Sequence, residues 1–209
     1  MKAFLYVLCL LLGYALGNFQ TAILLSNGVY KDDVRQHGSG NAGTSNMLRV
    51  FGKRAGVWTF IGDCFKGVIA VLLGRLICGE VGGYVCGLGA VLGHDFPVLY
   101  KFKGGKGVAT TLGIAWACFP LLAALTTVIG FAIIWMTQMI SVGSLIGITF
   151  FSFGVLLRHE DNIPAIIFFM ILWALVIWRH KDNIKRLRRG EENRLFPHGK
   201  AKKNESADK

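Results

Sequence analysis

Long apolar runs recur along the whole chain, and they decide its fold class. A helix that crosses a bilayer needs about 20 apolar residues, and runs of this kind follow one another from the first residues to position 178. Hydrophobic residues make up 53% of the 209 residues and charged residues only 17%, whereas a soluble domain carries about 25% charged residues. The sequence therefore predicts an all-α integral membrane protein.

The apolar runs predict about seven transmembrane helices. The run 107–140 is too long for one helix, and Pro120 near its middle predicts a break into two short spans. The first run also resembles a cleavable signal peptide, but it is longer than the apolar region of such a peptide, which favours a retained anchor. Besides 107–140, which gives two spans, five runs give one span each. They are 3–25 (the first run), 57–78, 82–100, 142–157 and 163–178.

The distribution of Lys and Arg predicts the orientation of the chain, because these residues concentrate on the cytoplasmic side of membrane proteins. If the N-terminus lies outside, the cytoplasmic segments hold 19 of the 23 Lys and Arg residues; these segments are 26–56, 101–106, 138–141 and 179–209. We therefore expect an outside N-terminus and a cytoplasmic C-terminus. Residues 1–192 form one polytopic membrane domain in this interpretation, and 193–209 form a polar, flexible cytoplasmic tail.

The net charge of +11 does not indicate a nucleic-acid partner, although strongly basic proteins often have one. Apolar runs this long have no place in a nucleic-acid-binding domain. The five cysteines lie in apolar stretches, without a CxxC pair and without histidines at metal-binding spacing. The sequence thus predicts neither a disulfide framework nor a zinc site.

Three polar segments follow the first, third and seventh predicted spans, so all three are expected on the cytoplasmic face. The first is GSGNAGTSN, residues 38–46, followed by Arg49. Its glycines allow backbone N–H groups to turn toward an anion, and Arg49 can grip a phosphate with two hydrogen bonds. The alternative is a flexible, solvated loop.

The second segment is GHDFPVLYKFKGGKGVAT, residues 93–110. It lacks the spacing of a nucleotide P-loop. A glycine turn before a helix still makes an anion site, and Lys106 would place a charge in it. Membrane anchoring explains Lys101 and Lys103 well, but it does not explain GGKG, whose glycines suggest that an anion approaches the backbone.

The third segment is RHKDNIKRLRRGEE, residues 179–192. On a helix His180 and Asn183 are neighbours, whereas much of the remaining charge suits anchoring at the membrane surface. Ser141, at the short turn before the sixth span, can reach the same site. Within the second span, Asp63 and Lys66 stand three residues apart and are expected to neutralise each other.

Together the three segments resemble the acyl-phosphate-dependent glycerol-3-phosphate acyltransferase family of small bacterial membrane enzymes. The match covers nearly the whole chain in order and spacing, and FKGGKGVAT is its most specific part. Ala42 stands where the family usually has Pro, and Ser45 where it usually has Thr. The resemblance implies a fold of seven helices with the N-terminus outside, which agrees with the orientation expected from charge.

The resemblance also implies the reaction and the site. A fatty acyl group moves from acyl phosphate to the 1-hydroxyl of glycerol 3-phosphate, which gives lysophosphatidic acid and inorganic phosphate as the first step of phospholipid synthesis. The implied catalytic residues are Ser39, Arg49, Lys106, His180 and Asn183. The implied substrate-binding residues are Gly38, Gly40, Asn41, Gly43, Ser45, Asn46, His94, Gly104, Gly105, Gly107, Thr110, Ser141 and Glu192.

The expected surroundings follow from the same resemblance. We expect no metal and no cofactor, a monomer in the bacterial cytoplasmic (inner) membrane with its active site facing the cytoplasm, and contact with the enzyme that produces acyl phosphate. Either His180 or a substrate phosphate can serve as the base. The rival interpretations are a transporter of a phosphorylated solute and an alcohol phosphotransferase, whose aspartate-rich metal motif is missing. The His-x4-Asp pair of the other acyltransferase type is also missing.

Overall fold

The computed structural model describes residues 1–195, and all regular structure in that part of the chain is helical, which confirms the all-α prediction. Most of the predicted tail, 196–209, lies outside the described residues. The elements in chain order are α1 (Lys2–Gly17), α2 (Thr21–Gly28), η1 (Val34–Gln36), α3 (Thr44–Asp95), η2 (Val98–Tyr100), α4 (Val108–Cys118), α5 (Pro120–Thr137), α6 (Ile140–Arg158), α7 (Ile163–Arg179) and α8 (Lys181–Arg188).

Helix α3 is a hairpin of two arms, not one rod. Its backbone leaves helical geometry at Gly52 and again at Cys78 and Gly79, where φ of Gly79 is +68°. The arms pack closely, since a Cβ built on Gly74 would lie 2.2 Å from the carbonyl oxygen of Gly82. The turn lies between the runs 57–78 and 82–100, where the sequence predicts a loop.

The first predicted span, 3–25, lies within one apolar segment long enough to cross a membrane, Lys2–Gly28, but its helix is interrupted. Helix α1 ends at Gly17 and α2 begins at Thr21. The side chain of Asn18 donates to the carbonyl of Tyr14 at 2.7 Å, and Gln20 donates to the carbonyls of Gly17 and His94 at 3.0 Å each. These side-chain hydrogen bonds compete with the helix ladder and end it.

The other predicted breaks are present. Phe119 leaves helical geometry and Pro120 opens α5 at its first turn, where a proline costs no hydrogen bond. Gln138, in the left-handed conformation, separates α5 from α6. At the α6–α7 connection the side chain of Asn162 caps α7 by accepting from the N–H of Ala165.

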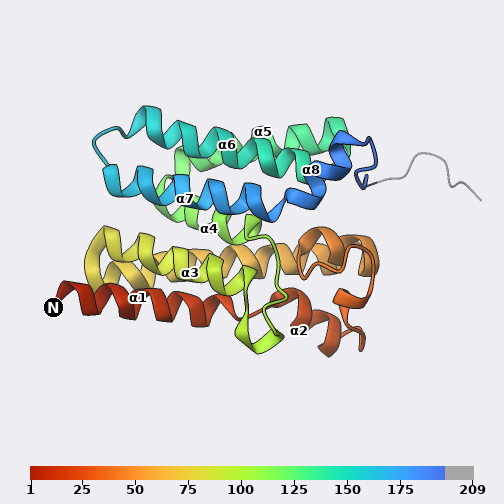
Figure 1. The fold of residues 1–209 in the computed structure, drawn as a ribbon, viewed down its shortest axis with the longest axis horizontal. Helices are drawn as coiled ribbons and strands as arrows, with labels where there is room; N and C mark the ends of the chain where they lie inside the picture. Colours follow the sequence, from red (N-terminus) through yellow and green to blue (C-terminus); the bar gives the residue numbers. More distant parts are fainter. Residues whose placement is uncertain (196–209) are drawn as a thin grey trace, which may run out of the picture.

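The helices form two layers with α4 between them (Figure 1). One layer holds α1, α2 and α3, and the other holds α5 to α8. Glycines bring α1 and α3 together: a Cβ on Gly13 would lie 1.9 Å from the carbonyl oxygen of Cys86. An aromatic cluster around Phe151, Phe168 and Phe169 joins α6 and α7 to α3 and α4.

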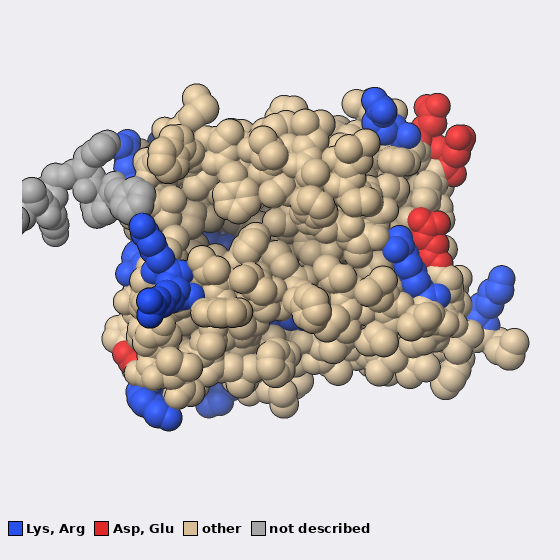
Figure 2. All heavy atoms as spheres, turned by 180° about the vertical axis from the view of Figure 1, so that it is seen from behind, with Lys and Arg blue, Asp and Glu red and all other residues tan. Residues whose placement is uncertain are grey.

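The outer surface is apolar between two charged ends. On the face shown in Figure 2, Lys, Arg, Asp and Glu gather at the two ends, and the surface between them is almost entirely free of these residues. Large apolar side chains in the middle of the helices are exposed, for example Phe65 at 63% and Val128 at 68%. By length and composition four helices qualify as membrane spans, or five if α7 and α8, which meet at 56°, count as one. The apolar surface between the charged ends is suited to contact with lipid tails.

All three polar segments predicted to share a site lie at one end of the molecule. The loops before and after α3, the α5–α6 turn and α8 are at this end, whereas the N-terminus, the turn of α3 and the α6–α7 connection are at the other (Figure 1). This arrangement matches the alternation of loops expected from the sequence.

The glycine contact between α1 and α3 leads to a prediction on stability. Gly13→Ala places a methyl group against the backbone of Cys86, and overpacking of this kind costs about 1–3 kcal/mol. For a chain of this size the Tm should fall by about 2–4 °C per kcal/mol, measured by thermal unfolding in detergent. Gly28→Ala is the matched control, because nothing lies within 4 Å of a Cβ there. Equal Tm values for the two variants would contradict a tight crossing.

Candidate active site

The loop 38–46 is held in shape by the side chain of Asn46 at the start of α3. Its Oδ1 accepts from the N–H of Ser39 at 3.0 Å, and its Nδ2 donates to the carbonyls of Val34 and His37 at 3.0 Å each. Gly38 has φ +60°, a conformation that glycine adopts at little cost. Asn46 is fully buried. Because both N–H groups of its amide donate to loop carbonyls, neither is left to bind a substrate.

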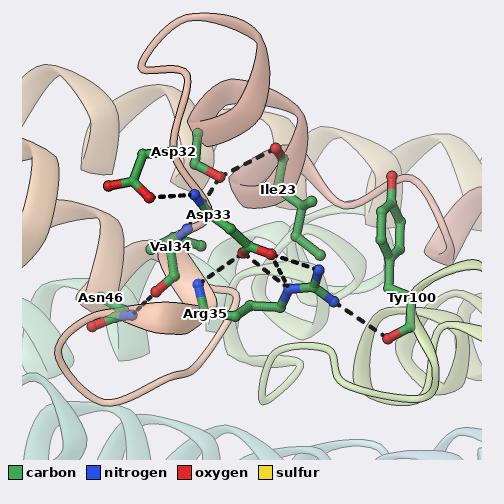
Figure 3. A network of polar contacts seen from close by, with 8 residues as sticks. Ile23, Asp32, Asp33, Val34, Arg35, Asn46 and Tyr100 are labelled. Carbon is green, nitrogen blue, oxygen red and sulfur yellow. Dashed lines mark hydrogen bonds and ion pairs between the residues drawn. The ribbon is translucent and has the colours of Figure 1, made fainter.

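A second network ties this loop to the loop after α3 (Figure 3). The guanidinium of Arg35 pairs with Asp33 at 2.7 Å, donates to the carbonyl of Tyr100 at 3.4 Å, and lies 5.7 Å from the centre of the Tyr100 ring. On the other side, the N–H of Val34 donates to Ser26 at 3.4 Å. The first and second polar segments therefore form one joined surface.

The glycines of GGKG pack against His94, at the C-terminal end of α3. A Cβ on Gly104 would lie 2.0 Å from the carbonyl oxygen of His94, and one on Gly105 would lie 2.0 Å from its Nε2. The N–H of Gly105 donates to that carbonyl at 3.0 Å. Close packing on the protein itself thus explains these two glycines, where the sequence suggested the approach of an anion. Gly107, with φ +69°, caps α4.

Lys106 connects the second polar segment to the third, because its Nζ donates to Oδ1 of Asn183. Burial, and after it the positive charge of Arg186, lower the pKa of Lys106 to about 8. A lysine with a lowered pKa in a cavity is a candidate for function. The structure therefore brings together two of the residues expected to be catalytic.

His180 lies at the bend between α7 and α8 and is buried. Its Nδ1 is 2.8 Å from the carbonyl oxygen of Val176. Since a carbonyl only accepts, Nδ1 carries the hydrogen, and Nε2 of the neutral ring is left with a free lone pair. His180 lines the larger of two cavities described below.

Glu192 organises the end of the third segment. Gly190, with φ +71°, turns the chain back after α8. The buried carboxylate of Glu192 then accepts from Ser141 at 3.0 Å, from Asn183 at 2.6 Å and from Arg186 at 2.9 Å. Ser141, Asn183 and Glu192, all expected in the site, therefore form one network that links the start of α6 to α8.

Two arginines of the site were not among the expected residues. Arg179 donates to the carbonyl of Gly105 at 2.6 Å and lies 3.7 Å from the carboxylate of Asp95, whose oxygens have no hydrogen-bond partner within residues 1–195. Arg186 binds Glu192. The signal for both was in the sequence, since positions 179, 183 and 186 share one face of a helix.

Two cavities meet at this end of the molecule. The larger, of about 490 Å³, runs between α3, α4, α5 and α6 along mainly apolar side chains such as Phe60, Leu112 and Ile148. The smaller, of about 300 Å³, is polar and has four more cations besides Lys106; they are Lys103, Arg179, Lys181 and Arg186. Both cavities are lined by Ser39, Asn41, Lys106 and Arg186.

Most of the expected site residues line these cavities. Two of the expected residues, Gly40 and Gly104, line only the smaller cavity. Those that line only the larger cavity are Gly43, Ser45, Arg49, His94, Gly107, Ser141, His180 and Asn183. The five that line neither are Gly38, Asn46, Gly105, Thr110 and Glu192. Among the residues that the structure describes, no group of three His, Cys, Asp or Glu is placed to hold a metal ion.

Known proteins match this chain in sequence and in structure. A sequence model of the family "Glycerol-3-phosphate acyltransferase" matches residues 7–190. A glycerol-3-phosphate acyltransferase of Thermoanaerobacter pseudethanolicus is 40% identical over 190 residues, which cover 90% of this chain and 95% of that protein. One of Finegoldia magna is 39% identical over 194 residues, which cover 91% of this chain and 98% of that protein.

Two crystal structures of PlsY (YgiH), an integral membrane glycerol 3-phosphate acyltransferase, have the same fold. The form with lysophosphatidic acid gives a TM-score of 0.82 at 31% identity, over 90% of this chain and 94% of that chain. The form with glycerol 3-phosphate gives a TM-score of 0.80 at 34% identity, over 92% and 94%. On this agreement of sequence and fold, the chain belongs to the glycerol-3-phosphate acyltransferase family, whose members of the PlsY type are integral membrane enzymes of phospholipid synthesis.

Proposed function

We propose that this enzyme transfers a fatty acyl group from acyl phosphate to the 1-hydroxyl of sn-glycerol 3-phosphate, giving lysophosphatidic acid and inorganic phosphate. The observation that carries the proposal is the meeting of an apolar and a cationic cavity at Ser39, Asn41, Lys106 and Arg186. A donor with a long apolar chain and a phosphate head fits the larger cavity. A small, soluble phosphate ester fits the smaller one, and the reacting groups meet where the cavities join.

The site provides what this reaction needs. Acyl phosphate is already activated, so the protein has to hold two anionic phosphates close together and place the hydroxyl group. Lys106 and Arg49 supply positive charge, Ser39 supplies a hydrogen bond, and Asn183 orients Lys106. The hydroxyl proton passes to Nε2 of His180 or to a substrate phosphate as the hydroxyl oxygen attacks the acyl carbon and phosphate leaves.

The remaining residues of the family motifs support these groups. Gly40, Asn41 and Gly104 form the wall that the smaller cavity presents to glycerol 3-phosphate. Gly43, Ser45 and Gly107 lie on the larger cavity, on the side of the donor phosphate. In this scheme Gly38, Asn46, Gly105, Thr110 and Glu192 act on the substrates only through the residues that they hold in place.

The same proposal includes the topology. Counting α1, the two arms of α3, and α4 to α7 separately gives seven spans, with the N-terminus outside and the site facing the cytoplasm of a bacterial inner membrane. The joining of all three polar segments at the end opposite the N-terminus supports this orientation, as does the excess of Lys and Arg in those segments. Residues 1–192 act as one domain, since Glu192 bonds to α6 and α8.

A monomer is sufficient in this scheme, because one chain lines both cavities. Acyl phosphate would enter the larger cavity from the bilayer or directly from the enzyme that produces it. Of the predicted tail 193–209, the part 196–209 lies outside the described residues. Leu195 does not extend away from the protein: its N–H donates to the carbonyl of Gln138 at 2.7 Å, and it lines the larger cavity together with Asn193.

Release of phosphate by the purified protein tests the reaction. With palmitoyl phosphate, the protein in detergent should release phosphate only when glycerol 3-phosphate is added, and EDTA should not stop it. Lys106→Ala should lower kcat/KM by about ten- to a hundred-fold, as expected for a lost charge-assisted contact. Lys101→Ala, an exposed control outside both cavities, should change little. A transporter would release no phosphate, and equal effects of the two variants would exclude the assigned role of Lys106.

Labelling of single cysteines tests the orientation. In a background without the five native cysteines, Glu160→Cys should react with a membrane-impermeant maleimide added to spheroplasts. Lys103→Cys and Lys185→Cys should react only after the membrane is opened, because they lie at the opposite, cytoplasmic end. All three positions are exposed in the structure. Labelling of position 103 or 185 from outside would refute the proposed topology.

The lowered pKa of Lys106 predicts a pH dependence. The ammonium is charged below about pH 8 and loses its proton as the pH rises through that value. Since kcat/KM reports ionisation of the free enzyme, kcat/KM for glycerol 3-phosphate should fall by up to about tenfold per pH unit above pH 8, until it reaches the level of Lys106→Ala. Lys106→Arg keeps the charge, so kcat/KM of this variant should not change with pH above pH 8, whatever its absolute value. If wild type and Lys106→Arg lose activity equally above pH 8, the loss comes from the ionisation of another group.

A further inference from the structure

A buried ionic cluster lies beside the larger cavity, and only one of its three residues, His94, is among those expected to bind a substrate. It consists of Asp63 and Lys66 on the first arm of α3 and His94 at the end of the second arm, and none is more than 4% exposed. The expected pairing of Asp63 with Lys66 is present, at 2.8 Å. Ionisable groups at membrane depth are costly and mark functional sites. The ion pair accounts for Asp63 and Lys66, but it does not account for the burial of His94 beside them.

The hydrogen bonds of Lys66 determine which nitrogen of His94 carries a hydrogen. The Lys66 Nζ lies 2.8 Å from Asp63, 3.0 Å from the carbonyl oxygen of Phe19 and 2.8 Å from Nδ1 of His94. An ammonium group only donates, so Nδ1 of His94 must accept. The hydrogen of the neutral imidazole is therefore on Nε2.

Asp63 fixes Lys66 in turn. Its Oδ1 accepts from Lys66 and also from the hydroxyl of Thr21, at 3.0 Å. Because Oδ1 of Asp63 accepts from both groups, it holds the ammonium group of Lys66 in place beside the His94 ring. This chain of contacts runs from the start of α2 through α3 to the second polar segment.

His94, whose Nε2 lies beside the backbone of Gly105, lines the cavity proposed to hold the acyl donor. Nε2 has no hydrogen-bond partner among residues 1–195, and His94 lines the larger cavity but not the smaller one. The ring lies against Gly105, directly before Lys106, since a Cβ on Gly105 would come within 2.0 Å of Nε2. His94 thus offers a neutral donor beside the cationic end of the apolar cavity.

We propose that Lys66 is a positioning residue that, held by Asp63, fixes His94 with Nε2–H as a hydrogen-bond donor to an oxygen of the acyl phosphate. A donor fixed before the reaction stabilises the charge that develops on the acyl carbonyl oxygen without reorganisation. The inference rests on the proposed function. It assigns His94 to the acyl donor and not to glycerol 3-phosphate, whose cavity His94 does not reach.

Steady-state kinetics with each substrate varied in turn tests this assignment. His94→Leu removes the donor and should lower kcat/KM for palmitoyl phosphate about a hundred-fold, the effect of one lost oxyanion donor, with little change in KM for glycerol 3-phosphate. His94→Gln keeps an N–H group near the position of Nε2 and should recover part of the loss. Equal rates for Leu and Gln, or a selective rise in KM for glycerol 3-phosphate, would overturn the proposal.

A paired substitution tests the role of Lys66. Asp63→Asn with Lys66→Met removes both charges together and frees the His94 ring to take either tautomer. The pair should lower kcat/KM for palmitoyl phosphate about tenfold or more, as a wrongly held histidine does in hydrolases. Combined with His94→Leu it should have no further effect, because Lys66 acts through His94.

An equal loss with and without His94 would show an independent, structural role for the pair and overturn the positioning role. If the pair does not fold, the two His94 variants still decide whether the donor exists. The proposed function is judged separately, by phosphate release from the wild-type protein. An active wild type together with any of the contrary results above speaks against this inference alone.

Discussion

Contact between glycine backbones is the condition on which the rest of this structure depends. In a bilayer the hydrophobic effect does not draw helices together, so close packing and hydrogen bonds must hold them. A Cβ on Gly13, Gly89 or Gly113 would lie within 2.3 Å of a carbonyl oxygen on a facing helix. These contacts fix α1 and α4 against the hairpin of α3. With the helices so fixed, the loops that carry the three polar segments lie together at one end of the molecule.

Hydrogen bonds and ion pairs then connect the loops at this end to one another and to the helices. Asn46 shapes the first loop, Arg35 joins it to the second, Arg179 holds the carbonyl of Gly105, and Glu192 closes the third segment on α6. Every link uses a polar side chain that would be costly to leave unpaired at this depth. The cavities are therefore bordered by a polar rim that is already organised before a substrate arrives, which suits catalysis by positioning.

Much of the fold and part of the candidate site can be predicted from the sequence, for physical reasons. The apolar runs and Pro120 predict the helices, and the alternation of the loops predicts that the three motifs meet at one end of the molecule, because each reflects a local rule. The break at residues 18–20 escaped prediction because Asn18 and Gln20 bond to groups that only the fold supplies. For the same reason the glycines of GGKG suggested a ligand, while the structure shows His94 against them. Arg179 resembles a membrane anchor until its contact with Gly105 is known.

The network around Glu192 has a consequence for the making of the enzyme. Ser39 lies before the hairpin of α3, whereas the carboxylate that orients Asn183, and through it Lys106, comes after every helix described. A nascent chain can insert its spans one after another and still lack these contacts until residue 192 has been synthesised and has folded back onto α6. In the proposed mechanism, acyl transfer is therefore expected only from chains that have been completed to this point.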